Sequence, residues 1–392
     1  MRWDFDVAIV GGGPAGTSTA LHLVRRERIA PRSVAMLEKA KHPRVKPCAG
    51  AVSAWGVDAL AAIGVPIGVP HVLMRGLRVL TARDGGEHTR TLGVVVRRCE
   101  FDAFLWNEAR AAGVRASDGE ALTGLERTTG GWRLKTPLRA FTARIVLACD
   151  GAGSTVRKLL GVREAARKGH LYVAETSPRP CDDGPRRGLC DFDLGVADDG
   201  VEGYYWDFPT IVDGAPSVSR GIYHANFHAR RDLKEHLARS LARRGLALGD
   251  VHLLPYSTRP FVAGSPLVHD GVLLVGEAAG IDATTGEGIA QAIRMGAMAA
   301  THVARALRSG DACAGGYAHE VTRSRMGRHL LQSAWLARRV YTSSRGRAWR
   351  SFLAREALAR EAGARWYAGE RLGWGLKTRL AAGLALALAA GG

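Results

Sequence analysis

The stretch "VGGGPAG" at residues 10–16 decides the fold that we predict for this chain. It follows the apolar run "FDVAIV", which is typical of a buried strand, and it opens "PAGTSTALHLVRR", which is typical of a helix. Gly11, Gly13 and Gly16 have the spacing G-x-G-x-x-G. In that setting the first glycine permits a tight turn, the second lets the backbone approach a diphosphate, and the third lets the helix pack closely on the sheet. The pattern therefore predicts a dinucleotide site at a helix N-terminus.

An acidic residue completes this pattern. The run "SVAMLE" predicts a second parallel strand that ends at Glu38, 22 residues after Gly16. A carboxylate at that place can accept hydrogen bonds from a ribose. The fingerprint by itself does not distinguish NAD from FAD. The predicted site also includes the neighbours of these residues, namely Gly12, Pro14, Ala15 and Lys39.

The bulk composition bounds the class of protein. The chain has 392 residues, enough for two or three domains, and 46% of them are hydrophobic. Its six cysteines form no C-x-x-C pair and no zinc or disulfide spacing, so we predict no metal site and a reduced, cytoplasmic protein. Because the first predicted strand begins within a few residues of the N-terminus, we expect no signal peptide.

The net charge of +18 has three interpretations. In the first, the arginine-rich helical stretches only form a solvated surface. In the second, they attract an anionic membrane or an acidic carrier, and in the third they bind nucleic acid. We find no nucleic-acid recognition motif and therefore expect no nucleic-acid partner. The last apolar run, "TRLAAGLALALAAGG", is shorter than the about 20 residues that span a bilayer. We therefore expect no transmembrane anchor here, and a peripheral contact is the kind of membrane binding that remains open.

The remaining elements predict a discontinuous nucleotide-binding domain. "TARIVLACDG" and "GVLLVGEAAG" indicate further strands, stretches such as "GIYHANFHA" indicate an antiparallel sheet between them, and the chain is mainly helical from Glu287 onward. We predict an α/β fold: a Rossmann-like cofactor-binding domain, an inserted antiparallel β-sheet substrate domain and a helical C-terminal region. The predicted boundaries are 1–70 with 95–165 and 265–305 for the first, 71–94 with 166–264 for the second, and 306–392 for the third.

Two further segments resemble known flavoproteins. "LACDGAGSTVRKLLG" resembles the D-G motif of the para-hydroxybenzoate hydroxylase-like flavoproteins, and "GVLLVGEAAGIDATTGEGIAQAIRMG" resembles their G-D motif with the loop and helix that follow it. With the N-terminal fingerprint, these segments cover the cofactor half of the fold. The resemblance implies that the cofactor is FAD.

Two details resemble the geranylgeranyl reductase family in particular. "KPCAGAVS", which contains Cys48, resembles that family's K-P-C-G-G segment, and "GYYWDFP" fits its G-Y-x-W-x-F-P pattern. The related flavin-dependent halogenases carry W-x-W-x-I-P instead, and Tyr204 and Phe208 depart from it. The chain also departs from the reductases, with Glu277 at the usual aspartate, Ala49 at a usual glycine, and no proline before the threonine of "DATTGEG".

The resemblance implies a set of residues around FAD. Arg98 is expected to reach the phosphates or the ribityl chain, and Leu122 to contact adenine through its backbone. Asp150 is expected to order the D-G turn more than to touch FAD. The glycines of "TTGEGIAQAIRMG" let backbone N–H groups approach the flavin at a helix start, whose partial positive charge favours the anionic reduced form. The implied set is Cys48, Ala49, Arg98, Leu122, Asp150, Gly151, Gly276, Glu277, Gly286, Gly288 and Ile289.

Three residues are candidates for catalysis: Cys48, Tyr205 and Trp206. We group Tyr205 and Trp206 with Phe208 on one face of a strand, toward a cavity for an apolar or aromatic substrate. Cys48 either positions the flavin or substrate, or donates a proton, or is only a small packing residue.

Three functions stay open. A reductase would transfer a hydride from reduced FAD to a C=C bond of a prenyl-like or other apolar substrate, drawn from a membrane or held on a carrier. A monooxygenase or halogenase would use O2 on an aromatic or carrier-tethered substrate. A flavin-binding protein would have no turnover. No second G-x-G-x-x-G follows, so NAD(P)H binds transiently or another reductant supplies electrons.

Overall fold

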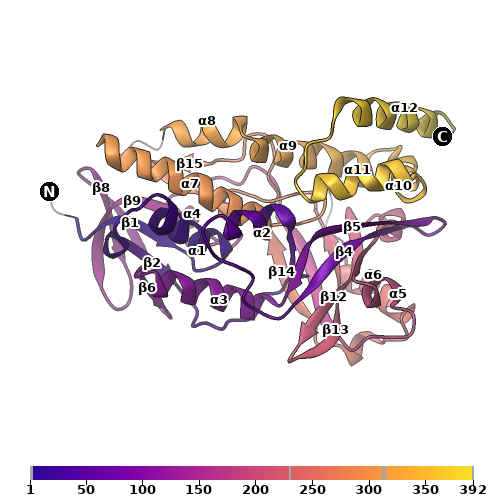
Figure 1. The fold of residues 1–392 in the computed structure, drawn as a ribbon, viewed down its shortest axis with the longest axis horizontal. Coiled ribbons are helices and arrows are strands. Elements are labelled where there is room, and N and C mark those ends of the chain that lie inside the picture. Colours follow the sequence, from indigo (N-terminus) through magenta and orange to yellow (C-terminus); the bar gives the residue numbers. More distant parts are fainter. Residues whose placement is uncertain (1–2, 229–230, 311–314, 391–392) are drawn as a thin grey trace.

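Two β-sheets with helices packed on them form the molecule (Figure 1). The structure is a computed structural model and describes residues 3–228, 231–310 and 315–390. A mainly parallel sheet, sheet A, lies at one end, and a mainly antiparallel sheet, sheet B, lies at the other. Helices of the C-terminal part cover one side of both. The predicted fold class, α/β with an antiparallel second sheet and a helical C-terminal region, is confirmed.

Sheet A has the Rossmann-like order β15-β16-β9-β1-β2-β6 along its main path. Strand β1 lies at its centre and pairs in parallel with β2 through Val7 and Val34 and with β9 through Ala8 and Val146. Because helices cover both faces of a parallel sheet, its central strands are apolar throughout, as "FDVAIV" indicated. Within the described residues its strands are β1 (Phe5–Val10), β2 (Val34–Glu38), β6 (Arg115–Asp118), β7 (Gly124–Thr128), β8 (Gly131–Lys135), β9 (Ala140–Ala148), β15 (Val268–His269) and β16 (Val272–Leu274).

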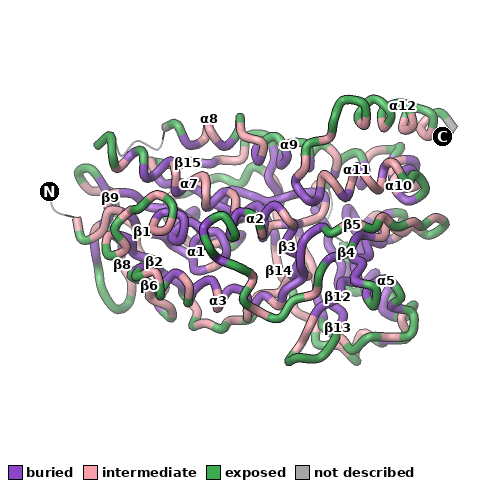
Figure 2. Tube along the Cα trace, in the orientation of Figure 1, coloured by how far each residue is buried: buried purple, intermediate pink, exposed green. Residues whose placement is uncertain are grey.

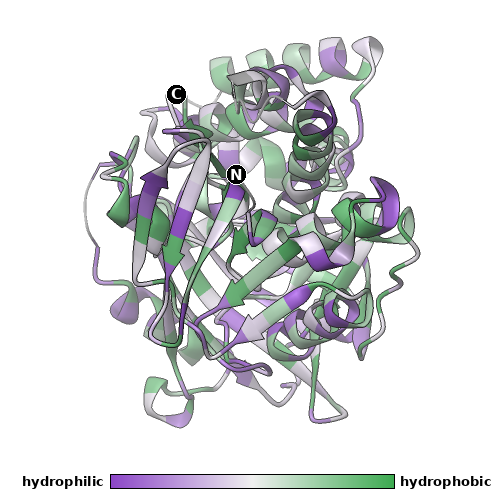
Figure 3. Ribbon diagram, turned by 90° about the vertical axis from the view of Figure 1, so that its left-hand side faces the viewer, coloured by the Kyte–Doolittle hydropathy of each residue, from purple (hydrophilic) through white to green (hydrophobic). Residues whose placement is uncertain are grey.

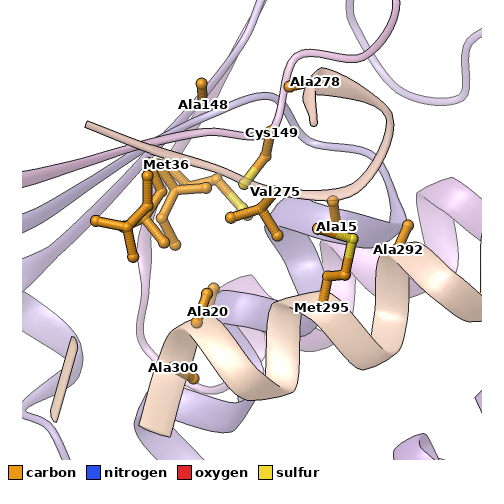
Figure 4. Packing of buried hydrophobic residues seen from close by; sticks show 14 of the residues in the cluster. Ala15, Ala20, Met36, Ala148, Cys149, Val275, Ala278, Ala292, Met295 and Ala300 are labelled. Carbon is orange, nitrogen blue, oxygen red and sulfur yellow. The ribbon is translucent and has the colours of Figure 1, made fainter. Parts of the chain in front are cut away.

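Helices α1 (Pro14–Leu21) and α7 (Ile289–Ser309) pack closely because small side chains meet between them. Figure 4 shows Ala15 and Ala20 of α1 beside Ala292, Met295 and Ala300 of α7. A Cβ atom at Gly296 would lie 2.8 Å from the carbonyl oxygen of Ala15, so α7 approaches as closely as a glycine permits. This packing brings the N-terminus of α7 beside the glycine turn of β1.

Sheet B has the order β14-β10-β13-β12-β11-β4-β5-β3, antiparallel except for the parallel pair of β11 and β4. It contains β3 (Ala51–Ser53), a stretch that we predicted to lie in the first domain, so sheet B includes the segment that follows Cys48. The predicted domain boundaries otherwise stay a prediction. The remaining described strands are β4 (His71–Leu80), β5 (Gly85–Val96), β10 (Gly169–Thr176), β11 (Leu189–Asp193), β12 (Gly203–Val212), β13 (Ala215–His224) and β14 (Leu254–Thr258).

The C-terminal region is helical, as predicted. Figure 2 shows that its last helix is mostly exposed, whereas α1 is buried. Figure 3 shows hydrophobic residues along the central strands and hydrophilic residues mainly at strand ends and in outer turns. In the part of the chain that the structure describes, no helix has both the length and the apolarity to cross a membrane. Residues 311–314 and 391–392 of the predicted region lie outside the described residues.

The other helices surround these two sheets. Their bounds are α2 (Ala54–Ala61), α3 (Arg98–Ala111), α4 (Thr155–Leu159), α5 (Asp183–Arg186), α6 (Leu233–Ala242), α8 (Gly315–Arg323), α9 (Arg325–Ala337), α10 (Gly346–Arg355), α11 (Ala357–Tyr367) and α12 (Trp374–Ala390).

Candidate active site

The glycine turn after β1 has the geometry that its spacing predicts. Gly11 has a φ of +112°, and a Cβ atom there would lie 2.4 Å from the carbonyl oxygen of Cys149. A Cβ at Gly16 would lie 1.9 Å from the carbonyl oxygen of Gly11, so only glycine lets α1 sit this close to the turn. A Cβ at Gly13 would meet only the Arg44 guanidinium, at 3.3 Å, among the described atoms within 4 Å. The backbone at Gly13 is therefore open to a ligand.

Glu38 is fixed in place at the end of β2. Its Oε2 accepts the Gly12 N–H at 2.9 Å, and its Oε1 accepts the Ala40 N–H at 3.1 Å. A carboxylate has about four lone-pair sites, so each oxygen can accept a further hydrogen bond, for example from a ribose hydroxyl. The Gly12 N–H thus fixes the position of the Glu38 carboxylate, and Gly12 itself does not line the cavity beside it.

A cavity of about 410 Å³ begins at this turn and passes the ends of β1, β2 and β9. Ligands of open parallel sheets bind at this place, beyond the carboxyl ends of the strands. The cavity contacts most of the residues predicted for the cofactor. Those that line it are Gly11, Gly13, Pro14, Ala15, Glu38, Lys39, Cys48, Arg98, Leu122, Asp150, Gly151, Glu277, Gly286, Gly288 and Ile289.

Three predicted residues lie behind this wall and one lies beside it. Gly12 holds Glu38, Gly16 packs against the turn, and a Cβ at Gly276 would lie 2.7 Å from that of Ala15. Ala49 lines the neighbouring cavity described below. The first three positions therefore set the shape of the site and do not face a ligand.

Basic side chains and one free acceptor make the cavity suitable for a dinucleotide. Arg44, Lys46 and Arg98 line it and can neutralise a diphosphate. The guanidinium of Arg98 donates to both carboxylate oxygens of Asp102 at 2.8 Å. Burial lowers the pKa of Arg98, but the interactions with Asp102 and Cys48 together outweigh burial and keep that pKa raised. Asp150 Oδ2 accepts the N–H at the start of α4, whereas no hydrogen bond from the described residues reaches its buried Oδ1. An unpaired buried acceptor is costly, so a donor from a ligand fits there.

A second, aromatic cavity adjoins the first. It measures about 50 Å³ and shares Cys48, Leu171, Gly286, Gly288 and Ile289 with the larger cavity. Side chains from β11, β12, β13 and α11 form its walls. Its aromatic residues are Phe192, Tyr204, Trp206, Phe208, Tyr223 and Tyr367.

Tyr205 does not belong to this cavity, and the predicted grouping of Tyr205 with Trp206 and Phe208 is wrong. Side chains alternate along a strand, so Tyr204, Trp206 and Phe208 share one face of β12 and Tyr205 points to the other. There its hydroxyl donates to Asp207 at 2.8 Å, and the Arg244 guanidinium lies 4.3 Å from the centre of its ring. Trp206 lies where a substrate residue was predicted, but a catalytic role for it stays a prediction.

Three tyrosines hold the loop that precedes α7. The hydroxyl of Tyr341 donates to the carbonyl oxygen of Thr284 at 2.6 Å, and that of Tyr223 donates to Ala283 at 3.2 Å. The Tyr204 hydroxyl donates to the next carbonyl, that of Thr285. Consecutive carbonyls are thus fixed by side chains from β12, β13 and the C-terminal region. Gly286 and Gly288 follow directly, so the wall shared by the two cavities is rigidly placed.

Known proteins with this architecture agree with the site. Residues 4–180 match a family described as "FAD binding domain". Digeranylgeranylglycerophospholipid reductase 1 of Methanothermobacter thermautotrophicus is 28% identical over 331 residues, which cover 80% of this chain and 80% of that protein. The chain is an FAD-dependent oxidoreductase that is similar to the geranylgeranyl reductases. The expectation of FAD is thereby confirmed, whereas the reductant that supplies its electrons stays a prediction.

Solved structures extend the likeness over the whole fold. A geranylgeranyl bacteriochlorophyll reductase-like protein from Thermoplasma acidophilum has a TM-score of 0.71 at 22% identity, covering 98% of this chain and 96% of that one. A flavin-dependent brominase has a TM-score of 0.73 at 17% identity, covering 97% and 98%. At these identities the likeness shows the shared fold alone and not the reaction.

The glutamate that replaces the usual aspartate has partners of its own in this geranylgeranyl reductase-like protein. Glu277 Oε2 accepts the Tyr256 hydroxyl at 2.9 Å and lies 3.9 Å from the Lys46 ammonium. That ammonium also lies 3.2 Å from the centre of the Tyr256 ring. Burial lowers the pKa of Lys46 to about 8, although Glu277 opposes the shift. The extra methylene of Glu277 thus reaches a lysine and a tyrosine at the cofactor cavity.

Cys48 lies where the two cavities meet. The Gly50 N–H points at its Sγ at 3.4 Å, and Gly50 has a φ of +85°, so the thiol closes a tight turn. Its side chain also interacts with the Arg98 guanidinium. A positioning role and a proton-donating role both remain compatible with this place.

Four residues of the site are not among those predicted from the sequence, namely Glu287, Tyr223, Tyr341 and Tyr367. Glu287 lies between Gly286 and Gly288 in "TTGEGI", a stretch in which the glycines alone are interpreted as a cofactor contact. Tyr223 faces Tyr204 across the β12–β13 hairpin, and the hairpin register could have revealed it. No local signal marks the other two tyrosines, because long-range packing alone brings the C-terminal region to the site.

Proposed function

We propose that this protein reduces carbon–carbon double bonds of an apolar, prenyl-like substrate that binds in the aromatic cavity. The observation that carries the proposal is the shared wall at Cys48, Gly286 and Gly288, because a group in the aromatic cavity lies against the cofactor cavity there. When bound and reduced, FAD supplies the hydride. The protein's own residues supply an apolar, water-poor pocket and an acid that can complete the reduction.

The aromatic cavity suits an alkene and argues against a halogenase. Its walls are mainly aromatic, aliphatic or small, with Glu287 the single carboxyl among the described residues that line it. A halogenase needs a lysine at the far end of a tunnel from the flavin. None of the described lining residues of this cavity is a lysine, and Lys46 faces the cofactor cavity with Glu277.

The size of the cavity limits how the substrate enters. A volume of about 50 Å³ lies between the volumes that one and two water molecules occupy in the liquid. An isoprenoid unit therefore enters only when the aromatic side chains move apart. We propose that a single alkene of the chain is held there, with the rest of the substrate extending outward to a membrane or a carrier.

Product analysis tests the proposal. The FAD-loaded protein is reduced chemically without oxygen and incubated with geranylgeranyl diphosphate, or with a compact aromatic such as indole. We expect a prenyl product that is heavier by two hydrogens and forms without O2. An oxygenated aromatic product that forms only with O2, or a halogenated one that forms only with O2 and halide, would contradict the reductase proposal. It would indicate a monooxygenase or a halogenase instead.

A further inference from the structure

The position of Glu287 sets it apart from every other acid near the site. It stands between Gly286 and Gly288, which line both cavities, and Glu287 is itself among the residues that line the aromatic one. Only 7% of Glu287 is exposed. Its Oε1 accepts the Ala290 N–H in the first turn of α7 at 3.0 Å. Glu287 therefore lies at the edge of the substrate space, and its carboxyl is close enough to Tyr367, another residue of that cavity, to interact with it electrostatically.

The surroundings of Glu287 favour its neutral form. Among the described residues, no ion pair joins it to a cation, and no lysine, arginine or histidine lines the aromatic cavity. The charged or titratable groups near it are Asp282 of the same loop, Tyr367 of α11, and Cys48, Tyr204 and Tyr223 of the cavity wall. His329 of α9 lies 3.7 Å from Asp282. Burial first, and the Asp282 charge second, raise the pKa of Glu287 to about 8. This direction favours the protonated carboxyl at neutral pH.

The other hydroxyl groups of the cavity are poorer donors. The hydroxyls of Tyr204 and Tyr223 already donate to the carbonyl oxygens of Thr285 and Ala283. Burial also raises the pKa values of Tyr204, Tyr223 and Tyr367 above the ordinary range, which makes all three weaker acids. The thiol of Cys48 is the one rival, because it lines both cavities.

We propose that Glu287 is the catalytic acid that protonates the substrate carbon during alkene reduction. This inference rests on the proposed reductase function. The π bond of the substrate opens, one carbon takes the hydride and its neighbour takes the Glu287 proton, so the substrate gains two hydrogens. Glu287 is left as a carboxylate and regains its proton from water. No oxidant or metal is needed, since the two electrons come with the hydride.

Single turnovers with geranylgeranyl diphosphate test the role. Glu287→Gln keeps the shape and neutrality of the protonated side chain and its contact with the Ala290 N–H, so the FAD spectrum and thermal midpoint should stay as in the wild type. We expect anaerobic flavin reoxidation to slow by about 100-fold or more, the usual share of a general acid. Glu287→Asp should recover part of the rate, and Cys48→Ala should slow it by less than about tenfold.

The pH profile separates Glu287 from Lys46, which titrates in the same range. The wild-type rate should fall as pH rises through about 8, because the neutral acid is lost. Lys46→Met should keep this fall, and the residual rate of Glu287→Gln should not show it. A substrate-free infrared spectrum should contain a carboxylic-acid carbonyl band at pH 7 that weakens at pH 9 and is missing in Glu287→Gln.

The outcomes distinguish the two proposals. A wild type that reduces the prenyl probe while Glu287→Gln does so at the same rate overturns the acid role and leaves the reductase. Absence of the infrared band at pH 7 also overturns the acid role. A wild type that reduces no alkene removes the reductase function and, with it, this role for Glu287, whatever the infrared spectrum shows.

Discussion

The hydroxyl of Tyr341 donates a 2.6 Å hydrogen bond to the carbonyl oxygen of Thr284, although 57 residues separate the two in sequence. Both residues are buried. The bond ties the C-terminal helical region to the loop that carries the shared wall of the two cavities. The C-terminal region therefore forms part of the active site and is more than a cover for the sheets.

Tyr341→Phe should loosen this loop. Loss of one buried hydrogen bond, with the Thr284 carbonyl left unpaired, should lower the free energy of unfolding by about 1–2 kcal/mol and weaken FAD binding. Denaturant unfolding and FAD titration measure the two effects. Tyr317→Phe is the matched control, because the buried Tyr317 hydroxyl has no hydrogen-bond partner among the described residues, so its removal should cost little. Equal effects of the two variants would contradict the role of the loop contact.

Lys46 should couple the flavin potential to pH. Below pH 8 its ammonium is charged and favours the anionic reduced flavin, and above pH 8 that charge is lost. The midpoint potential of bound FAD should therefore fall more steeply with pH once pH exceeds about 8. Lys46→Met should have a lower potential than the wild type at pH 7 and no such break.

Spectroelectrochemistry between pH 6 and pH 9 measures this dependence. Lys39→Met serves as the control, because Lys39 adjoins Glu38 at the predicted ribose end of the site. If Lys46→Met follows the wild-type curve at every pH, Lys46 does not interact with the redox-active ring.

Trp206 should contribute to substrate binding and Tyr205 should not. Trp206→Phe removes part of an aromatic wall, so the KM for an apolar substrate should rise by about 2- to 10-fold with a smaller change in kcat. Tyr205→Phe removes a hydroxyl on the opposite face of β12, where it contacts Asp207, and should leave KM unchanged. A rise in KM for Tyr205→Phe equal to that for Trp206→Phe would restore the grouping that the strand geometry rejects.

The parts of the site that the sequence predicted are those that depend on local spacing. Gly11, Gly16 and Glu38 act within one strand–turn–helix–strand unit, so their chemistry can be read directly from their order. The predicted side of the strand for Tyr205 is wrong because side chains alternate along a strand with a period of two residues. Adjacent aromatic residues such as Tyr205 and Trp206 therefore face opposite sides of β12. Tyr341 and Tyr367 could not be predicted, since only the tertiary packing of the C-terminal helices brings them to the loop and the cavity.

The stoichiometry of an anaerobic single turnover tests the central claim most directly. The FAD-loaded protein, reduced by one equivalent of dithionite, is mixed without oxygen with geranylgeranyl diphosphate, and flavin absorbance and product are followed together. The account predicts that the flavin reoxidises and that one equivalent of product with one fewer double bond forms for each flavin. A flavin that stays reduced until O2 is admitted, with no saturated product, would contradict it.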